Sequence, residues 1–201
     1  MNIVCCDLEG VFVPEIWINV SEKTGIEELR LTTRDIPDYD VLMKKRLDLL
    51  DKNNLKLKDI QSAIAQMSPL PGADQFLSRL REKTQVIIVS DTFDQFAGPL
   101  MAKLGYPTLF CNTLVVDSSG HITDYRLRQK DGKRHVVMAL KSLNFTVYAM
   151  GDSYNDISMI KAADKGFLFC PPQNIITEFP EIPVCNTYDA IELLLSALLD
   201  A

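Results

Sequence analysis

Three short apolar runs in the sequence each end at a side chain that can take part in chemistry. The groups at these ends are Asp7, Ser90 and Asp152. In a parallel sheet the carboxyl ends of the strands share one edge, so groups that are remote in the sequence converge there. A fourth group, Lys133, opens a predicted helix just before the third run. We therefore predict one polar site that combines carboxylates, a hydroxyl and an ammonium.

The acidic residues have the chemistry of a magnesium site. Asp7 and Glu9 lie two positions apart, so both can face one pocket, and residues 151–156 add Asp152 and Asp156. Oxygen ligands without a nearby histidine suit Mg²⁺ better than zinc. We expect Asp7, Asp152 and the backbone carbonyl of Glu9 to hold the ion, with Asp156 supporting them. Magnesium would let the anionic Asp7 approach an anionic phosphate.

The basic residue of the site has two competitors. Lys130 and Arg134 flank Lys133, and basic side chains on a loop are usually solvated. Lys133 is preferred because it opens the helix that precedes the last apolar run.

The elements that would position these groups alternate along the chain. The apolar runs are too short for buried helices and predict buried parallel strands; they cover residues 3–6, 86–89, 147–150 and 167–170. Helical patterns lie near residues 73–83, 93–104, 133–143, 154–163 and 187–199. This alternation predicts an α/β fold with a doubly wound parallel, Rossmann-like sheet.

One stretch, residues 14–71, interrupts the alternation with helical patterns alone. Helices are expected there over residues 14–25, 38–53 and 59–67. We predict a helical cap of residues 14–71 on a catalytic core of residues 1–13 and 72–201. A second interruption, residues 113–125, alternates around Ser119-Gly120 and predicts a β-hairpin.

Composition excludes several classes of protein. The 201 residues carry a formal net charge of -6, a field that repels nucleic acid and anionic membranes. The five cysteines form no C-x-x-C pair, and their odd number indicates reduced thiols in the cytoplasm. The N-terminus has no signal-peptide pattern, and no apolar stretch approaches the roughly 18 residues of a membrane span. We expect a cytoplasmic protein with a small-molecule substrate; its oligomeric state is not predicted.

The motifs, in their order, resemble those of the haloacid dehalogenase-like hydrolases. They are Asp7-x-Glu9, Ser90, Lys133 and Gly151-Asp152-x-x-Asn155-Asp156. The resemblance spans nearly the whole chain, and the inserted helices resemble the cap of that superfamily in position. Any one motif alone would be a weak signal, whereas four in order at strand ends are a strong one.

The resemblance implies a role for each motif residue. Asp7 would attack phosphorus and become an aspartyl-phosphate, and Glu9 would protonate the leaving oxygen and then activate the acceptor. Ser90 and the N–H of Asp91 would bind phosphoryl oxygens, while Lys133 would neutralise charge. The family usually has aspartate at the second acidic position, so the longer Glu9 indicates an unusual branch.

Within the family, the chain is most similar to phosphoserine phosphatases and to the bifunctional phosphoserine phosphatase/homoserine phosphotransferases. This implies hydrolysis of O-phospho-L-serine, with transfer to homoserine as a second activity, in serine and threonine biosynthesis. Glu15 would pair with the substrate ammonium, Arg46 would clamp its carboxylate, and Asn155 would hold the substrate or Asp7. The sequence alone does not choose Arg46 over Arg30 or Arg34.

Two alternatives remain open from the sequence. A phosphatase of the same fold could act on another small phosphate ester. A signalling receiver module would also combine a phosphorylatable aspartate, a hydroxyl and a lysine around magnesium. Receiver modules lack so long a helical insertion and the late Gly-Asp-x-x-Asn-Asp motif.

Overall fold

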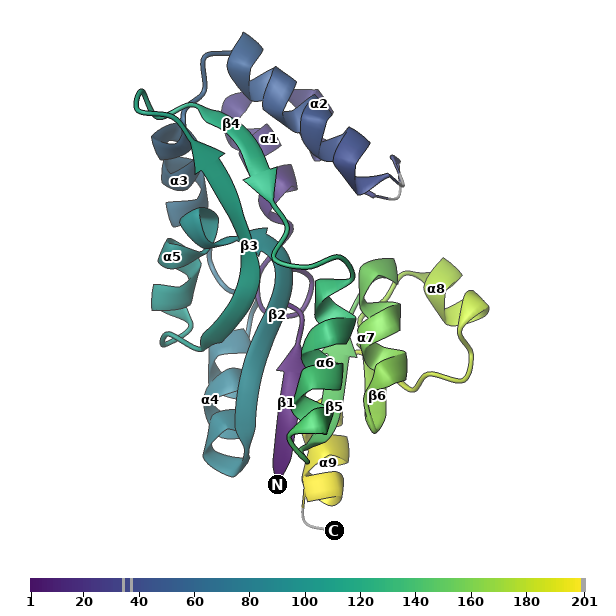
Figure 1. Ribbon diagram of the computed structural model, residues 1–201. Helices are drawn as coiled ribbons and strands as arrows, with labels where there is room; N and C mark the ends of the chain where they lie inside the picture. Colours follow the sequence, from purple (N-terminus) through teal and green to yellow (C-terminus); the bar gives the residue numbers. More distant parts are fainter. Residues whose placement is uncertain (34, 37, 200–201) are drawn as a thin grey trace.

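The computed structural model describes residues 1–33, 35–36 and 38–199 (Figure 1). Arg34, one alternative for binding a carboxylate, lies outside these ranges. The described residues form a seven-stranded sheet in the order β4-β3-β2-β1-β5-β6-β7. Its strands are β1 Asn2–Cys6, β2 Gln85–Phe93, β3 Thr108–Val116, β4 Ile122–Arg126, β5 Thr146–Gly151, β6 Lys165–Phe169 and β7 Val184–Cys185. Only the β3–β4 pair within this sheet is antiparallel, so the predicted α/β fold is confirmed.

Helices cover both faces of the sheet, and the alternation of side chains along β1 shows why. Val4 and Cys6 belong to one apolar cluster, while Ile3 and Cys5 belong to the other. The first cluster takes side chains from α4 Ala73–Lys83, α5 Asp94–Lys103 and α9 Tyr188–Leu199. The second takes them from α6 Gly132–Ser142 and α7 Ile157–Ala162. A strand buried on both faces reads as a continuous apolar run, which is what the sequence contains.

The inserted segment is helical, as predicted. It contains α1 Ile16–Thr24, the 3-10 helix η1 Glu27–Arg30, α2 Tyr39–Lys52 and α3 Leu57–Ala65. Gly25 ends α1 in the left-handed region at φ 74°, where glycine has no steric cost. Asp38 begins α2 by accepting a hydrogen bond from the N–H of Val41 at 3.1 Å. The division into a cap of residues 14–71 and a core stays a prediction.

The β-hairpin is longer than predicted and lies against the inserted helices. Figure 1 shows β3 and β4 rising from the sheet so that β4 lies beside α2. The tip is attached to the start of α3, because the N–H of Leu57 donates to the carbonyl of Gly120 at 2.9 Å. The Tyr125 hydroxyl donates to Asp40 on α2 at 2.7 Å. The hairpin at the edge of the sheet and the insertion, remote in the sequence, therefore pack against each other.

Several boundaries differ from prediction, each for a local reason. Strand β2 continues to Phe93 instead of ending at Val89. A bulge at the polar residues 90–92 interrupts its pairing with β3, which resumes at Phe93. The helix expected over residues 154–163 is divided into η2 Tyr154–Asp156 and α7. Two elements were not predicted, α8 Gln173–Glu178 and β7, because they are too short to show a period.

Two predictions from composition can be compared with the structure. All five cysteines are free thiols. None of the helices formed by the described ranges is both long and apolar enough to span a bilayer.

Candidate active site

The buried pair of Asp7 and Lys133 lies at the carboxyl edge of the sheet. Asp7 follows β1 directly, and its N–H donates to the carbonyl of Met150 in β5 at 2.9 Å. Lys133, the second residue of α6, brings its Nζ to 2.9 Å from Asp7 Oδ1 and 2.6 Å from Asp156 Oδ1. Burial alone would lower the pKa of Lys133, but the carboxylates of Asp156 and Asp7 outweigh it and hold that pKa well above its usual value.

Lys133 differs in exposure and contacts from Arg134 and Lys130, the two alternatives. Lys133 is 3% exposed, whereas Arg134 is half-exposed and lies 4.0 Å from Asp131. Lys130 lines a cavity next to the site without a contact to Asp7. Of these three basic residues, Lys133 is the one that contacts Asp7 among the described residues, and its catalytic role stays a prediction.

Asp156 is held by the turn that it closes. Its Oδ2 accepts hydrogen bonds from the N–H groups of Asp152 and Ser153, both at 3.0 Å. A Cβ on Gly151 would lie 2.2 Å from Asp156 Cγ, so only glycine leaves room for this carboxylate. Gly10, at φ +76°, has the same relation to Asp152, whose Cγ would lie 2.4 Å from an added Cβ. The two glycines allow the acids to approach the backbone closely.

Three acids meet at one point and suit a divalent cation. Asp7, Asp152 and Asp156 are all buried, and each offers an oxygen within 4.8 Å of the others. Burial raises the pKa of Asp7 well above its usual value, and Asp156 raises it further, while Lys133 lowers it. Three buried carboxylates facing one ammonium leave excess negative charge, which a hard cation with oxygen ligands would neutralise. The residues present therefore fit a divalent metal, in keeping with the sequence prediction.

Glu9 points toward the inserted helices. Its Oε2 accepts a hydrogen bond from the N–H of Ile16, in the first turn of α1, at 2.8 Å. Burial and the nearby negative charge of Glu15 raise the pKa of Glu9 to about 8, against the N–H of Ile16, which lowers it. A carboxyl group with this pKa carries its proton at neutral pH and can act as an acid.

The turn after Glu9 is attached to the last helix. The Tyr188 hydroxyl of α9 donates to the carbonyl of Val11 at 2.6 Å. The Tyr188 ring stacks between Phe76 and Phe169, with centroid distances of 4.9 and 4.8 Å. Tyr188 was not predicted from the sequence, because it belongs to none of the motifs.

Asp91 lies beside Lys133 and contacts Asn155, and Ser90 precedes it in the chain. Ser90 is buried in the bulge of β2, where its Oγ accepts from the N–H of Thr92 at 3.2 Å. Asp91 Oδ2 accepts from Asn155 Nδ2 at 2.8 Å and lies 3.9 Å from Lys133 Nζ. Asn155 thus contacts Asp91 in this structure, and not Asp7, one of the two partners expected for it.

A cavity of about 1140 Å³ extends from Lys133 and Asp91 to the inserted helices. Its lining includes Glu9, Glu15 and Arg46. Arg46 is 7% exposed, stacks 4.6 Å above the Trp17 ring and donates from Nη2 to the carbonyl of Leu31 at 2.8 Å. Within the described residues its buried Nε has no hydrogen-bond partner, and burial lowers the pKa of Arg46 to about 10. The guanidinium therefore stays charged at neutral pH.

Other cavity residues were not predicted from the sequence. Tyr39 and Tyr125 pack edge to face, 5.8 Å apart, and bring α2 and the hairpin to the cavity. Asn174 belongs to the missed helix α8 and lies next to Tyr154. Tyr39 begins α2, Tyr125 lies in the short strand β4 and Asn174 lies in the short helix α8. None of them belongs to a motif that marks it in the sequence.

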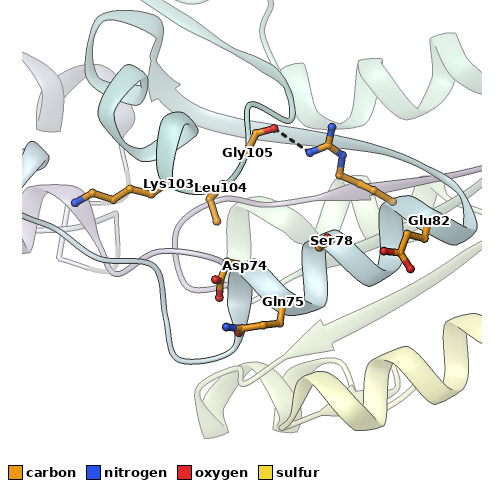
Figure 2. A pocket seen from close by; sticks show the side chains of 8 residues that line it. Asp74, Gln75, Ser78, Glu82, Lys103, Leu104 and Gly105 are labelled. Carbon is orange, nitrogen blue, oxygen red and sulfur yellow. Dashed lines mark hydrogen bonds between the residues drawn. The ribbon is translucent and has the colours of Figure 1, made fainter.

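A second pocket lies away from these residues, between α4 and the end of α5 (Figure 2). Its volume is about 640 Å³, and Asp74, Lys103 and Gly105 contribute to its lining. Arg81 closes one side by donating to the carbonyl of Gly105 at 3.0 Å. None of the predicted site residues lines it.

Comparison with known proteins agrees with the geometry. Residues 4–164 match the haloacid dehalogenase-like hydrolase family. The chain is 56% identical over 192 residues to "Phosphoserine phosphatase" of Pseudomonas syringae pv. tomato, covering 96% of this chain and 81% of that protein. It is equally similar over 192 residues to "Phosphoserine phosphatase ThrH" of Pseudomonas aeruginosa, at 56% identity and with 96% and 94% covered. A crystal structure of phosphoserine phosphatase in apo form superposes with a TM-score of 0.77 at 26% identity, covering 96% of this chain and 97% of the other.

Proposed function

The chain belongs to the haloacid dehalogenase-like hydrolases, and from this we propose that it is a phosphoserine phosphatase, which converts O-phospho-L-serine into L-serine and phosphate. The similarity to two phosphoserine phosphatases over 96% of the chain supports this reaction. We further propose transfer to homoserine as a second activity, which the resemblance of the sequence motifs supports.

One observation carries the proposal: the distribution of charge along the cavity. Lys133 lines it at the end where Asp7 lies, and the buried Arg46 lines it at the other. A phosphoamino acid carries a phosphate, a carboxylate and an ammonium. In our proposal Arg46 uses its unpaired Nε for a two-bond clamp on the carboxylate, and Glu15 binds the ammonium. The phosphate then points toward Asp7.

The acids would hold Mg²⁺. Asp7, Asp152 and the backbone carbonyl of Glu9 are the proposed ligands. Asp156 is already engaged by Lys133 and two N–H groups, which supports a role in orienting the other acids. A bound magnesium ion would neutralise charge between Asp7 and the phosphoryl oxygens.

In the first step Asp7 attacks phosphorus with a carboxylate oxygen, and the bond from phosphorus to the serine oxygen breaks. Glu9, with its pKa raised to about 8, gives its proton to that oxygen. Ser90, the N–H of Asp91 and Lys133 stabilise the negative charge of the phosphoryl oxygens. The product is an aspartyl-phosphate on Asp7 and free serine.

In the second step an acceptor attacks the aspartyl-phosphate. Glu9 takes a proton from water, the phosphorus–oxygen bond to Asp7 breaks, and inorganic phosphate leaves. If the hydroxyl of homoserine takes the place of water, the same step gives a phosphorylated homoserine. The identity of the bound acceptor would thus decide between hydrolysis and transfer.

A panel of phosphate esters tests this function. The purified protein is assayed with Mg²⁺ on phosphoserine, sugar phosphates, nucleotides and p-nitrophenyl phosphate, with and without homoserine. We expect the highest kcat/KM for phosphoserine, and phosphohomoserine when homoserine is added. A higher kcat/KM for a sugar phosphate or nucleotide would favour the other phosphatase reaction. Single phosphorylation without turnover would favour the receiver-like alternative.

A further inference from the structure

The end of β2 that carries Ser90 is not a regular strand. Between the pairs Val89–Phe110 and Phe93–Asn112, β2 advances four residues while β3 advances two. Residues 90–92 therefore face a single residue of β3, which is a β-bulge. A bulge takes backbone groups out of the ladder, so those groups need other hydrogen-bond partners.

The side chain of Asn112 supplies one of these partners. Its Nδ2 donates to the carbonyl of Asp91 at 3.2 Å, and its Oδ1 accepts from the N–H of Arg128 at 3.1 Å. A backbone carbonyl only accepts and an N–H only donates, so the two partners fix the orientation of the amide. Asn112, 7% exposed, thereby joins the bulge to the segment that leads from β4 to Lys133.

The same carbonyl has a partner in the inserted segment. The Tyr39 hydroxyl donates to the Asp91 carbonyl at 3.3 Å. Inside the bulge, Ser90 Oγ accepts from the N–H of Thr92 at 3.2 Å. These three bonds hold the peptide group between Asp91 and Thr92, and the last of them also orients the Ser90 hydroxyl. The N–H that our mechanism assigns to a phosphoryl oxygen belongs to the preceding peptide group of the same bulge.

We propose that Asn112 is a positioning residue of the reaction, which holds the bulge of β2 so that Ser90 and the N–H of Asp91 meet the phosphoryl group beside Lys133. Both groups of the Asn112 amide are engaged by backbone partners, so in our proposal it acts through the bulge and not on the substrate. The inference rests on one part of the proposed function, namely that a phosphoryl group binds at Asp7. It is independent of the leaving group.

Two substitutions test this role. Asn112→Asp keeps the size and the acceptor for the N–H of Arg128, but turns an oxygen toward the Asp91 carbonyl. Asn112→Leu removes both hydrogen bonds. Each is assayed for turnover of phosphoserine and p-nitrophenyl phosphate, inhibition by orthovanadate, activation by Mg²⁺, and thermal unfolding.

We expect kcat to fall by roughly 10²-fold in both variants, because a displacement of about 1 Å costs that much in a preorganised site. Orthovanadate mimics the phosphoryl group in the transition state. Its inhibition constant should rise by at least about tenfold, because its binding depends on the same donors, Ser90 and the N–H of Asp91. The activation constant of Mg²⁺ should stay unchanged, because Asp7 and Asp152 lie outside the bulge.

Asn53→Asp is the matched control. Asn53 ends α2 and donates from Nδ2 to the carbonyl of Leu49 at 2.8 Å, with its side chain exposed. The substitution makes the same chemical change and removes the same kind of hydrogen bond. Its kinetics and orthovanadate inhibition should match those of the wild-type protein.

Unchanged kcat and orthovanadate inhibition in Asn112→Asp would overturn the inference. So would equal weakening of orthovanadate and Mg²⁺ binding together with a fall in Tm, which indicates a general loss of structure. If Asn112→Leu fails to fold, Asn112→Asp decides, because it conserves volume. If the wild-type protein turns over p-nitrophenyl phosphate but not phosphoserine, the proposed function is wrong. The Asn112 variants can then still be compared with the wild-type protein on p-nitrophenyl phosphate.

Discussion

The two ends of the cavity hold their charges in opposite ways. At the sheet end, Lys133 already contacts Asp7 at 2.9 Å and Asp156 at 2.6 Å. At the other end, Arg46 contacts a backbone carbonyl, a thioether and an aromatic ring, and no ion pair to it occurs among the described residues. In the proposed mechanism, the charges that take part in bond making are thus held in place before the substrate arrives. Arg46, which would recognise the substrate, has no such ion pair among the described residues and can form one with the substrate carboxylate.

The largest effect should follow from removing the nucleophile at the sheet end. Asp7→Asn should lower kcat for phosphoserine by roughly 10⁴-fold or more. It should also raise the Tm of the metal-free protein. Burial and Asp156 raise the pKa of Asp7, and a raised carboxyl pKa means that stability is lost as the pH rises through it. The neutral asparagine removes that loss at neutral pH.

Turnover assays and calorimetry in a chelator measure both effects. An Asp7→Asn protein that still releases phosphate at an appreciable rate would contradict the covalent mechanism. A lower Tm at pH 8 without metal would contradict the account of charge at this end of the cavity.

The next prediction tests whether the two buried carboxylates at the sheet end depend on Lys133 for their stability. Lys133→Met leaves Asp7 and Asp156 buried without their cation, which should cost about 3–5 kcal/mol of unfolding free energy and abolish turnover. Arg134→Met is the matched control, because Arg134 is half-exposed and should change stability by less than about 0.5 kcal/mol. Urea unfolding of both variants measures the difference, and equal stabilities would contradict the prediction.

The sequence predicted the sheet end of the cavity better than the other end. Asp7, Ser90 and Asp152 follow short apolar runs, so the pattern of burial and the direction of parallel strands predict that they share one edge of the sheet. The setting of Arg46 depends on the angle at which α2 lies over Trp17, and no periodicity determines that angle. Asn112 lies in the largely apolar strand 108–116, directly before Thr113, where the predicted hairpin begins, so no pattern in the sequence distinguished it.

The effect at the recognition end should be smaller and selective. Arg46→Ala should lower kcat/KM for phosphoserine by roughly 10-fold to 10²-fold, the value of a charge-assisted hydrogen bond, mainly through KM. Turnover of p-nitrophenyl phosphate, which lacks the carboxylate, should be unchanged. Arg30→Ala is the control, since Arg30 pairs with Glu22 at 3.0 Å on the surface. Equal loss on both substrates after Arg46→Ala would contradict its role as a carboxylate clamp.

The smallest effect gives a baseline away from the cavity. Asp164 accepts from Lys141 Nζ and from the N–H of Val147, both at 2.8 Å, and these bonds lower its pKa. A lowered carboxyl pKa contributes stability that is present above the unfolded-state pKa and lost as the pH falls. Asp164→Asn should therefore cost about 0.2–1 kcal/mol at pH 7 and less at acidic pH. A cost that grows on acidification would contradict this sign.

The hydrogen bond from Tyr188 to Val11 connects α9 to the turn that follows Glu9, the proposed general acid. A protein shortened by its last helix would lose the support under the turn that carries Glu9. Such a truncated protein could retain the charge cluster around Lys133 and still be a poor catalyst. A tag that strains the packing of α9 would weaken the same support and lower activity.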